Sequence, residues 1–226
     1  MFLTIRLKIL LIVFSVILFL VFSFFTIHSV KATTPKHEYS IIIDAGHGGI
    51  DGGCEGGVTG VKESDLNLKY SLKLADICKS FGFKVILTRK DKNGLYAPFS
   101  TNKKRSEMEK RESIIKKSNA DLFVSVHMNS FPNKSLSGAQ VFYKIENEKG
   151  KELADSITNA LKGDIELRGN SKEGDYYVLN CHDKAGVLIE CGFLSNPEEE
   201  RLLQTEEYVD KFCQKVFQGI LSFLKM

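Results

Sequence analysis

The chain has 226 residues, of which 43% are hydrophobic and 26% are charged, as is ordinary for a globular protein. This length predicts one domain whose core needs no disulfide or metal to fold. The formal net charge is +3, but residues 1–37 contain four basic residues and no acidic one. Subtracting those four from the 31 basic residues leaves 27 against 28 acidic residues, a net charge of −1. A nearly neutral domain lacks the basic surface of a nucleic-acid-binding protein, so no nucleic-acid partner is expected.

The N-terminal region contains an uncharged and almost wholly apolar segment, Ile9–Ile27, which follows Arg6 and Lys8. As a helix it would span roughly 28 Å, close to the ~30 Å of a membrane's hydrocarbon core. The sequence therefore predicts that residues 1–30 are either a signal peptide or a membrane anchor, followed by a polar linker at residues 31–38. Positive residues before the segment predict that the domain lies outside the cell.

The domain begins with a short apolar strand that ends in an acid, a histidine and several glycines. Ile41–Ile43 is β-branched throughout, which predicts a strand buried on both faces of a parallel sheet. The stretch Asp44-Ala45-Gly46-His47-Gly48-Gly49 follows it, and its glycines allow a tight turn. His47 is therefore expected just beyond the end of a rigid strand, at the edge where α/β sheets bind ligands.

Two later apolar strands also end in polar residues. Asp121–Val126 is followed by His127, and Gly186–Ile189 is followed by Glu190. Taken alone, each polar residue is explained as a capped strand end. Taken together with His47, they predict one shared site, because the carboxyl ends of parallel strands meet at one edge of the sheet.

Hydrophobic periodicity and turn signals predict the other elements. A helix is expected to begin at the N-cap Ser64, and a charged helix at 102–119 is expected to be solvated, with Met108 and Ile115 facing inward. The further predictions are strands at 84–88, 138–144 and 175–179, and helices at 147–163 and 205–224. The alternation predicts a single α/β domain with a largely parallel twisted sheet flanked by helices, preceded by one N-terminal hydrophobic helix.

The five cysteines are odd in number and contain no C-x-x-C pair or zinc-finger spacing, so we expect no structural disulfides. Cys78 and Cys213 fall in helical patterns and are predicted to be core residues. Cys191, beside Glu190, suggests a thiol nucleophile. Strand alternation disfavours that hypothesis, because it turns adjacent side chains to opposite faces.

His47, Glu63 and His127 provide two imidazoles and one carboxylate. Catalytic zinc commonly has three such protein ligands and keeps a fourth position for water, whose pKa it lowers from 15.7 to about 7. Glu63 has a simpler explanation as a favourable charge at the start of a helix. Glu190 is expected to act as the general base, and not as a fourth ligand that would close the site.

Five motifs occur in order between Tyr39 and the C-terminus. They are Asp44-Ala45-Gly46-His47-Gly48-Gly49, Lys62-Glu63, Thr88-Arg89, Ser125-Val126-His127-Met128-Asn129-Ser130 and Glu190-Cys191-Gly192-Phe193-Leu194-Ser195-Asn196. Together they resemble the zinc-dependent N-acetylmuramoyl-L-alanine amidases of bacterial cell walls.

The resemblance implies that residues 39–226 are a catalytic domain. It implies one zinc ion per chain on His47, Glu63 and His127, with Glu190 catalytic. The implied reaction is hydrolysis of the amide between the lactyl group of N-acetylmuramic acid and L-alanine of the peptidoglycan stem peptide.

The short chain, its single apolar segment and the Ser137–Gln140 region are most similar to the small sporulation amidases. Those enzymes strip peptides from spore-cortex peptidoglycan so that muramic-δ-lactam can form. The resemblance implies a peptidoglycan substrate and an extracytoplasmic enzyme, either secreted or held at the membrane by its N-terminal segment. Met128 and Cys191 depart from the smaller or aliphatic residues expected there, which affects pocket shape. The sequence leaves open whether a partner protein activates the enzyme.

Two other functions are compatible with parts of the sequence. A phosphate- or nucleotide-binding protein would use the glycine loop, but Gly46-His47-Gly48 begins a G-x-G-x-x-G pattern that ends in Asp51, and no Gly-Lys-Ser/Thr follows. A catalytically inactive peptidoglycan-binding module is the second alternative. The presence of all four polar site residues argues against it.

Overall fold

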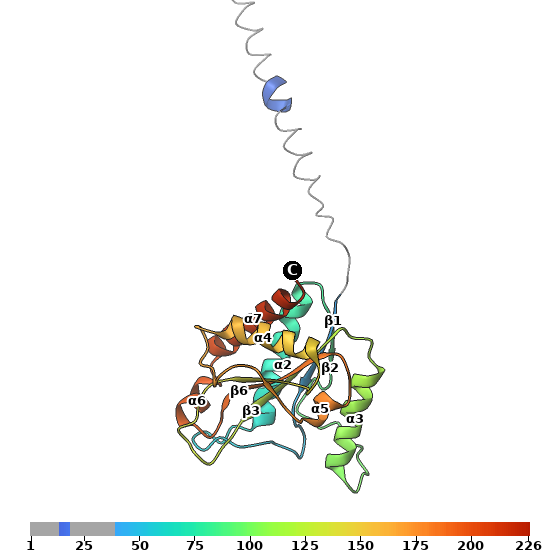
Figure 1. Cartoon of the computed structure of the whole chain (residues 1–226), viewed down its shortest axis with the longest axis vertical. Helices are drawn as coiled ribbons and strands as arrows, with labels where there is room; N and C mark the ends of the chain where they lie inside the picture. Colours follow the sequence, from blue (N-terminus) through green and yellow to red (C-terminus); the bar gives the residue numbers. More distant parts are fainter. Residues whose placement is uncertain (1–13, 19–38) are drawn as a thin grey trace, which may run out of the picture. The chain divides into compact units, whose positions relative to one another are not determined.

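The structure of the chain, a computed structural model, describes residues 14–18 and 39–226. Residues 14–18 are helical, and residues 39–226 form the folded domain (Figure 1). Within these two described ranges, no helix is both long enough and apolar enough to cross a membrane. The predicted anchor or signal peptide at Ile9–Ile27 and the linker at 31–38 lie mostly outside the described residues, so both stay predictions.

The domain is built on a six-stranded sheet with strand order β2-β1-β3-β6-β4-β5. The strands are β1 (Ser40–Ala45), β2 (Lys84–Leu87), β3 (Leu122–Asn129), β4 (Gln140–Tyr143), β5 (Lys172–Glu173) and β6 (Ala185–Phe193). Strands β2, β1, β3 and β6 are parallel, whereas β4 is antiparallel to β6. The predicted α/β domain with a largely parallel sheet is confirmed, but β5 was not predicted.

Six helices flank this sheet in the described domain. They are α2 (Glu63–Ser80), α3 (Lys103–Lys117), α4 (Glu148–Leu161), α5 (Tyr177–Asn180), α6 (Pro197–Leu202) and α7 (Glu206–Phe223). Helix α2 begins two residues earlier than predicted, since Lys62 and not Ser64 is its N-cap, and Ser64 lies buried in its first turn. Helix α6 was not predicted, although the Asn196 side chain caps it and Pro197 begins it.

The predicted strand at 175–179 is wrong, because this segment forms the short helix α5. Val178 and Leu179 are neighbours in sequence, and both are buried. A strand would turn these two side chains to opposite faces, whereas a helical turn can bury both against one surface.

Two apolar clusters cover the two faces of the sheet, because successive side chains of a strand point to opposite faces. On β1, Ile41 and Ile43 pack in the cluster that includes α2, α4 and α7, whereas Ile42 packs in the cluster that includes α3 and α5. The first cluster also contains Cys78 and Cys213, which confirms both as core residues. All five cysteines are free.

Helix α3 differs from its prediction in one respect that matters for the site. Ile115 faces inward as expected, but Glu107 and Arg111 are also buried. These three residues are four positions apart and therefore share one face of the helix. The charges on this face are packed against the sheet and are not solvated.

Candidate functional site

The parallel strands bring the predicted polar residues to one edge of the sheet. The Gly46 amide donates to the Val126 carbonyl at 3.1 Å, which joins the glycine loop to β3. His127 on β3 lies directly opposite Glu190 on β6 in the strand register. His47, His127 and Glu190 are therefore located at the same edge, as the strand pattern predicted.

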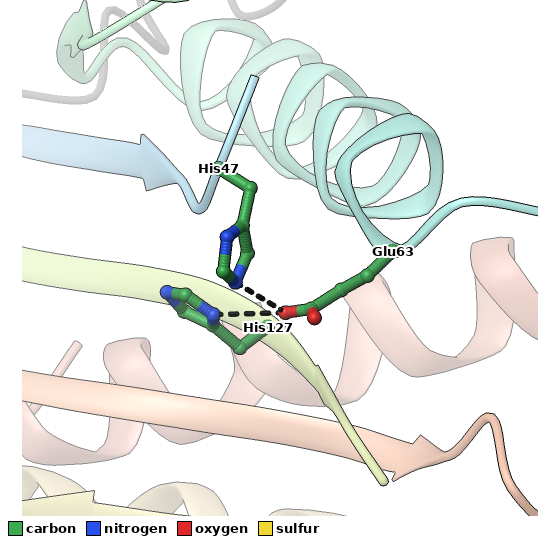
Figure 2. A group of neighbouring side chains, drawn as sticks. All are labelled: His47, Glu63 and His127. Atoms are coloured by element: carbon green, nitrogen blue, oxygen red, sulfur yellow. Dashed lines mark hydrogen bonds and ion pairs between the residues drawn. The ribbon is translucent and has the colours of Figure 1, made fainter. Parts of the chain in front are cut away.

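Glu63, at the start of α2, points its carboxylate toward both histidines, and one of its oxygens contacts both rings (Figure 2). Its Oε1 is 3.1 Å from His47 Nε2 and 3.0 Å from His127 Nδ1. Each of the three residues offers one ligand atom, and these atoms all lie within 4.8 Å of one another. Two imidazoles and one carboxylate are a donor set that catalytic zinc uses. The residues present therefore fit a single metal ion.

Several donors hold the Glu63 carboxylate in place. Oε1 accepts hydrogen bonds from Asn67 Nδ2 at 3.2 Å and from the Met128 amide at 3.3 Å, and Oε2 accepts one from the Cys54 amide at 2.9 Å. Burial would raise the pKa of Glu63, but hydrogen bonds to His127 and His47 outweigh it and hold this pKa well below its ordinary range. The carboxylate is therefore ionised, as a metal ligand must be.

His47 is oriented by a second carboxylate. Its Nδ1 lies 3.0 Å from Asp51 Oδ2, so the neutral ring would donate its proton there and leave the Nε2 lone pair facing Glu63. Carboxylates commonly orient metal-binding histidines in this way. Burial alone would lower the pKa of His47, but its bonds to Glu63 and Asp51 raise it to about 9. A metal ion would therefore have to displace a proton from this ring.

The position of the His127 ring depends on a glycine. A Cβ at position 46 would lie only 2.2 Å from His127 Cε1, closer than real side chains approach one another. Gly46 therefore provides the space in which the His127 ring stands against Glu63.

Glu190 is 9% exposed, and among the residues that the structure describes its Oε2 has no hydrogen-bond partner. Burial raises the pKa of Glu190 to about 7, with His127 opposing this rise and Glu63 adding to it. A carboxylate that titrates near neutral pH is suited to accept and return a proton.

A pocket of about 190 Å³ opens beside the two histidines. Its apolar lining residues include Met108 from α3, Tyr176 and Val178 at α5, and Leu188 from β6. Tyr176 also packs against Phe142 with ring centroids 5.3 Å apart, so it serves the core as well as the pocket. The pocket borders both histidines and the buried charges of α3, but its lining includes neither Glu63 nor Glu190.

Four buried or half-buried residues near this site were not predicted from the sequence. Asp44 is fully buried and accepts hydrogen bonds from Thr88 Oγ1 and Ser125 Oγ, both at 2.7 Å. Burial would raise the pKa of Asp44, but the Arg111 guanidinium and the hydrogen bonds from Ser125 and Thr88 together lower it. The other residues without an assigned role are Asp51, Glu107 and Arg111. Asp51 could have been predicted to contact His47, because it is a carboxylate only four residues after that histidine in the sequence.

Comparison with known proteins identifies the family. Residues 41–222 match the family model described as N-acetylmuramoyl-L-alanine amidase. The germination-specific N-acetylmuramoyl-L-alanine amidase of Bacillus subtilis (strain 168) is 35% identical over 189 residues, which cover 81% of this chain and 78% of that protein.

Two solved structures agree with this match. The CwlD amidase from Clostridioides difficile, solved in complex with the GerS lipoprotein, has a TM-score of 0.80 and 39% identity, covering 83% of this chain and 98% of that one. The catalytic domain of CwlV, an N-acetylmuramoyl-L-alanine amidase from Bacillus (Paenibacillus) polymyxa var. colistinus, has a TM-score of 0.71 and 28% identity, covering 83% and 98%. The chain belongs to the N-acetylmuramoyl-L-alanine amidase family, whose members are hydrolases of bacterial peptidoglycan.

Proposed function

We propose that this chain is a zinc-dependent amidase that cleaves the amide between the lactyl group of N-acetylmuramic acid and L-alanine of the stem peptide. One observation carries the proposal: His47 Nε2, Glu63 Oε1 and His127 Nδ1 converge at the strand edge. These three residues would hold one zinc ion per chain. The family match supports the amide bond as the target.

Zinc bound there would lower the pKa of a water molecule from 15.7 to about 7 and polarise the scissile carbonyl. Glu190 lies across from His127 in the strand register and has a pKa raised by burial to about 7. In the proposed mechanism its carboxylate accepts a proton from the attacking water and delivers it to the leaving nitrogen of L-alanine. Asp51 holds the His47 ring in the orientation that presents Nε2.

Metal analysis followed by product analysis tests this function. The purified protein, loaded with zinc, is incubated with peptidoglycan, and the products are identified by mass spectrometry beside a chelator-treated sample. We expect free stem peptides and intact glycan strands only with zinc. Cut glycan strands would indicate a glycosidase, and binding without any product would indicate an inactive wall-binding module.

A role in the spore cortex is the second part of the proposal. Its support is the 35% identity to a B. subtilis amidase whose name states that it is germination-specific. Expression of this chain in a B. subtilis strain that lacks its own germination-specific amidase should restore muramic-δ-lactam to the cortex. Cortex without the lactam, despite stable expression, would favour a role in vegetative wall turnover.

The proposal also places the domain outside the cytoplasm, with residues 1–30 as a signal peptide or a membrane anchor. N-terminal sequencing of the protein recovered from cells distinguishes these two, since cleavage would remove the apolar segment. The CwlD amidase was solved with a lipoprotein, which supports a partner protein for this chain as well. Affinity capture from sporulating cells, followed by reconstitution with purified components, would identify such a partner.

A further inference from the structure

The loop that carries His47 is held by two buried arginines. Arg89 donates from Nε to the Ala45 carbonyl at 3.0 Å and from Nη2 to the Gly46 carbonyl at 2.9 Å. Arg111 donates from Nη1 to the Ala45 carbonyl at 2.8 Å and from Nη2 to the His47 carbonyl at 2.6 Å. Three consecutive carbonyl groups of the loop are therefore bound by guanidinium groups.

His47 adopts a backbone conformation that side chains disfavour. Its φ is +58°, in the left-handed region that favours glycine. A residue persists in such a conformation only when its surroundings fix it. Arg111 makes the hydrogen bond to the carbonyl of this same residue. It is thus the side chain best placed to maintain the conformation from which the ring reaches Glu63.

Arg111 is itself fixed by two buried carboxylates. It is 2% exposed, pairs with Asp44 through Nη1 and donates from Nη2 to Glu107 Oε1 at 2.8 Å. With Arg89, these residues make two positive and two negative buried charges, which balance. The planar guanidinium serves four acceptors from two nitrogens, a pattern that the single ammonium group of lysine does not reproduce.

The helix that carries Arg111 makes few apolar contacts with the sheet side of the domain, through Ile115 and the partly buried Met108. On α3, the buried residues are Glu107, Arg111 and Ile115, of which only Ile115 is apolar. Arg111 therefore connects α3 to the loop of His47, and the polar face of this helix is directed at the site.

We propose that Arg111 is a positioning residue that sets the affinity of the site for zinc. By holding the His47 backbone, it aims Nε2 at the point where Glu63 and His127 also converge. The inference rests on the proposed zinc site. Residues that orient metal ligands typically change metal affinity by ~10–100-fold when replaced.

The test measures zinc affinity and thermal stability separately. Zinc dissociation constants are obtained by competition with a chromophoric chelator, and melting temperatures are recorded on the metal-free protein. Arg111→Lys keeps the charge beside Asp44 but loses the second nitrogen, and we expect ~10–100-fold weaker zinc binding. Glu107→Gln keeps an acceptor for Arg111 without its charge, and we expect a smaller weakening in the same direction.

Two controls lie on the same helix. Arg105→Lys replaces an exposed arginine that pairs with Glu109, and it should bind zinc as the parent does. Ile115→Ala removes a fully buried apolar side chain. It should lower the melting temperature while leaving the zinc dissociation constant unchanged.

The inference is overturned if Arg111→Lys and Glu107→Gln both fold and bind zinc as tightly as the parent. It is also overturned if Ile115→Ala and Arg111→Lys lower the melting temperature equally and weaken zinc binding equally. Arg111 would then affect zinc binding only through the stability of the fold. If Arg111→Lys does not fold, the zinc dissociation constant of Glu107→Gln is the test: a parental value overturns the inference, and a weakened one supports it. A parent protein that binds no zinc would refute the proposed function instead.

Discussion

The two faces of the sheet are packed in different ways. Helices α2, α4 and α7 cover one face with a large and almost purely apolar cluster. On the other face, α3 and α5 contribute to a smaller apolar cluster, and a network of buried charges lies at the strand edge. The first face provides most of the apolar burial and, from the start of α2, the Glu63 side chain. The second face holds the buried charges around Arg111 and the strand-borne polar groups of the site.

The pleat of the strands produces this division. Side chains two positions apart share a face, so Asp44 follows Ile42, Glu190 follows Leu188 and His127 follows Phe123 and Ser125 toward the α3 side. Cys191 points to the opposite side and belongs to the larger cluster, which argues against the thiol-nucleophile hypothesis. Substitutions on the two faces should therefore separate activity from stability.

The largest expected effect is on catalysis and comes from Glu190→Gln. The variant keeps the shape of the side chain and removes its basic oxygen, and loss of a general base costs about 10²–10⁴ in rate. Stem-peptide release should fall by at least ~10²-fold, while zinc content stays at the parental value. Exposed Glu173→Gln is the matched control. Loss of zinc would show that Glu190 is a ligand, and near-parental activity would show that another group is the base.

On the opposite face, Leu153→Ala should affect stability alone. Leu153 on α4 is fully buried in the larger cluster, and such truncations cost about 2–5 kcal/mol. Denaturant unfolding should show this loss, with an unchanged zinc dissociation constant. Leu202→Ala, at a half-exposed position, should cost much less. A Leu153→Ala variant with weakened zinc binding would mean that the two faces are coupled.

Asp51→Asn should weaken zinc binding without a comparable loss of stability. Asp51 is partly exposed and contacts His47 Nδ1 at 3.0 Å. An amide can still contact the ring but no longer favours the Nδ1-protonated form, so we expect ~10–100-fold lower zinc affinity. Chelator competition measures it, with exposed Asp76→Asn as the control. A parental zinc affinity in Asp51→Asn would show that Asp51 does not orient His47 for zinc.

The smallest expected effect concerns the pH dependence of stability. His182 packs against Phe123, and burial lowers its pKa from 6.5 to about 4, with Lys184 and Lys144 adding to this shift and Asp183 opposing it. The unfolded chain therefore binds more protons between these two values. The contribution of His182 to stability is unaffected above about pH 6.5 and becomes unfavourable as pH falls toward 4.

Between pH 7 and pH 5, the melting temperature of His182→Asn should fall less than that of the parent. We expect the two decreases to differ by about 2–4 °C. Carboxylates such as Asp44 are common to both proteins, so the difference isolates His182. Melting curves recorded at several pH values measure it. An identical pH dependence in the two proteins would contradict the assignment.

The sequence predicted the strand-edge site because its signals are local. The apolar runs ending at His47, His127 and Glu190 mark buried strands, and parallel topology places their ends together. Glu63 was included as the carboxylate at the start of the adjacent helix. All four could be proposed without knowledge of tertiary contacts.

The network around Asp44 could not be predicted in the same way. Arg111 and Asp44 are 67 residues apart in sequence, and mixed charges on a helix usually indicate a solvated face. The burial of Arg111 becomes evident only from its pairing with Asp44 in the folded structure. A local signal existed in the four-residue spacing of Glu107, Arg111 and the apolar Ile115. The antiparallel direction of β4 also depends on its pairing with β6, which periodicity does not specify.

Anomalous X-ray scattering at the zinc absorption edge, from crystals of the zinc-loaded protein, tests the central claim most directly. We expect one peak per chain, about 2.0–2.2 Å from His47 Nε2, a Glu63 oxygen and His127 Nδ1. Glu190 should lie nearby without ligating the ion. A peak at other residues, a Glu190 oxygen within bonding distance, or no peak in fully loaded crystals would contradict a zinc site on His47, Glu63 and His127.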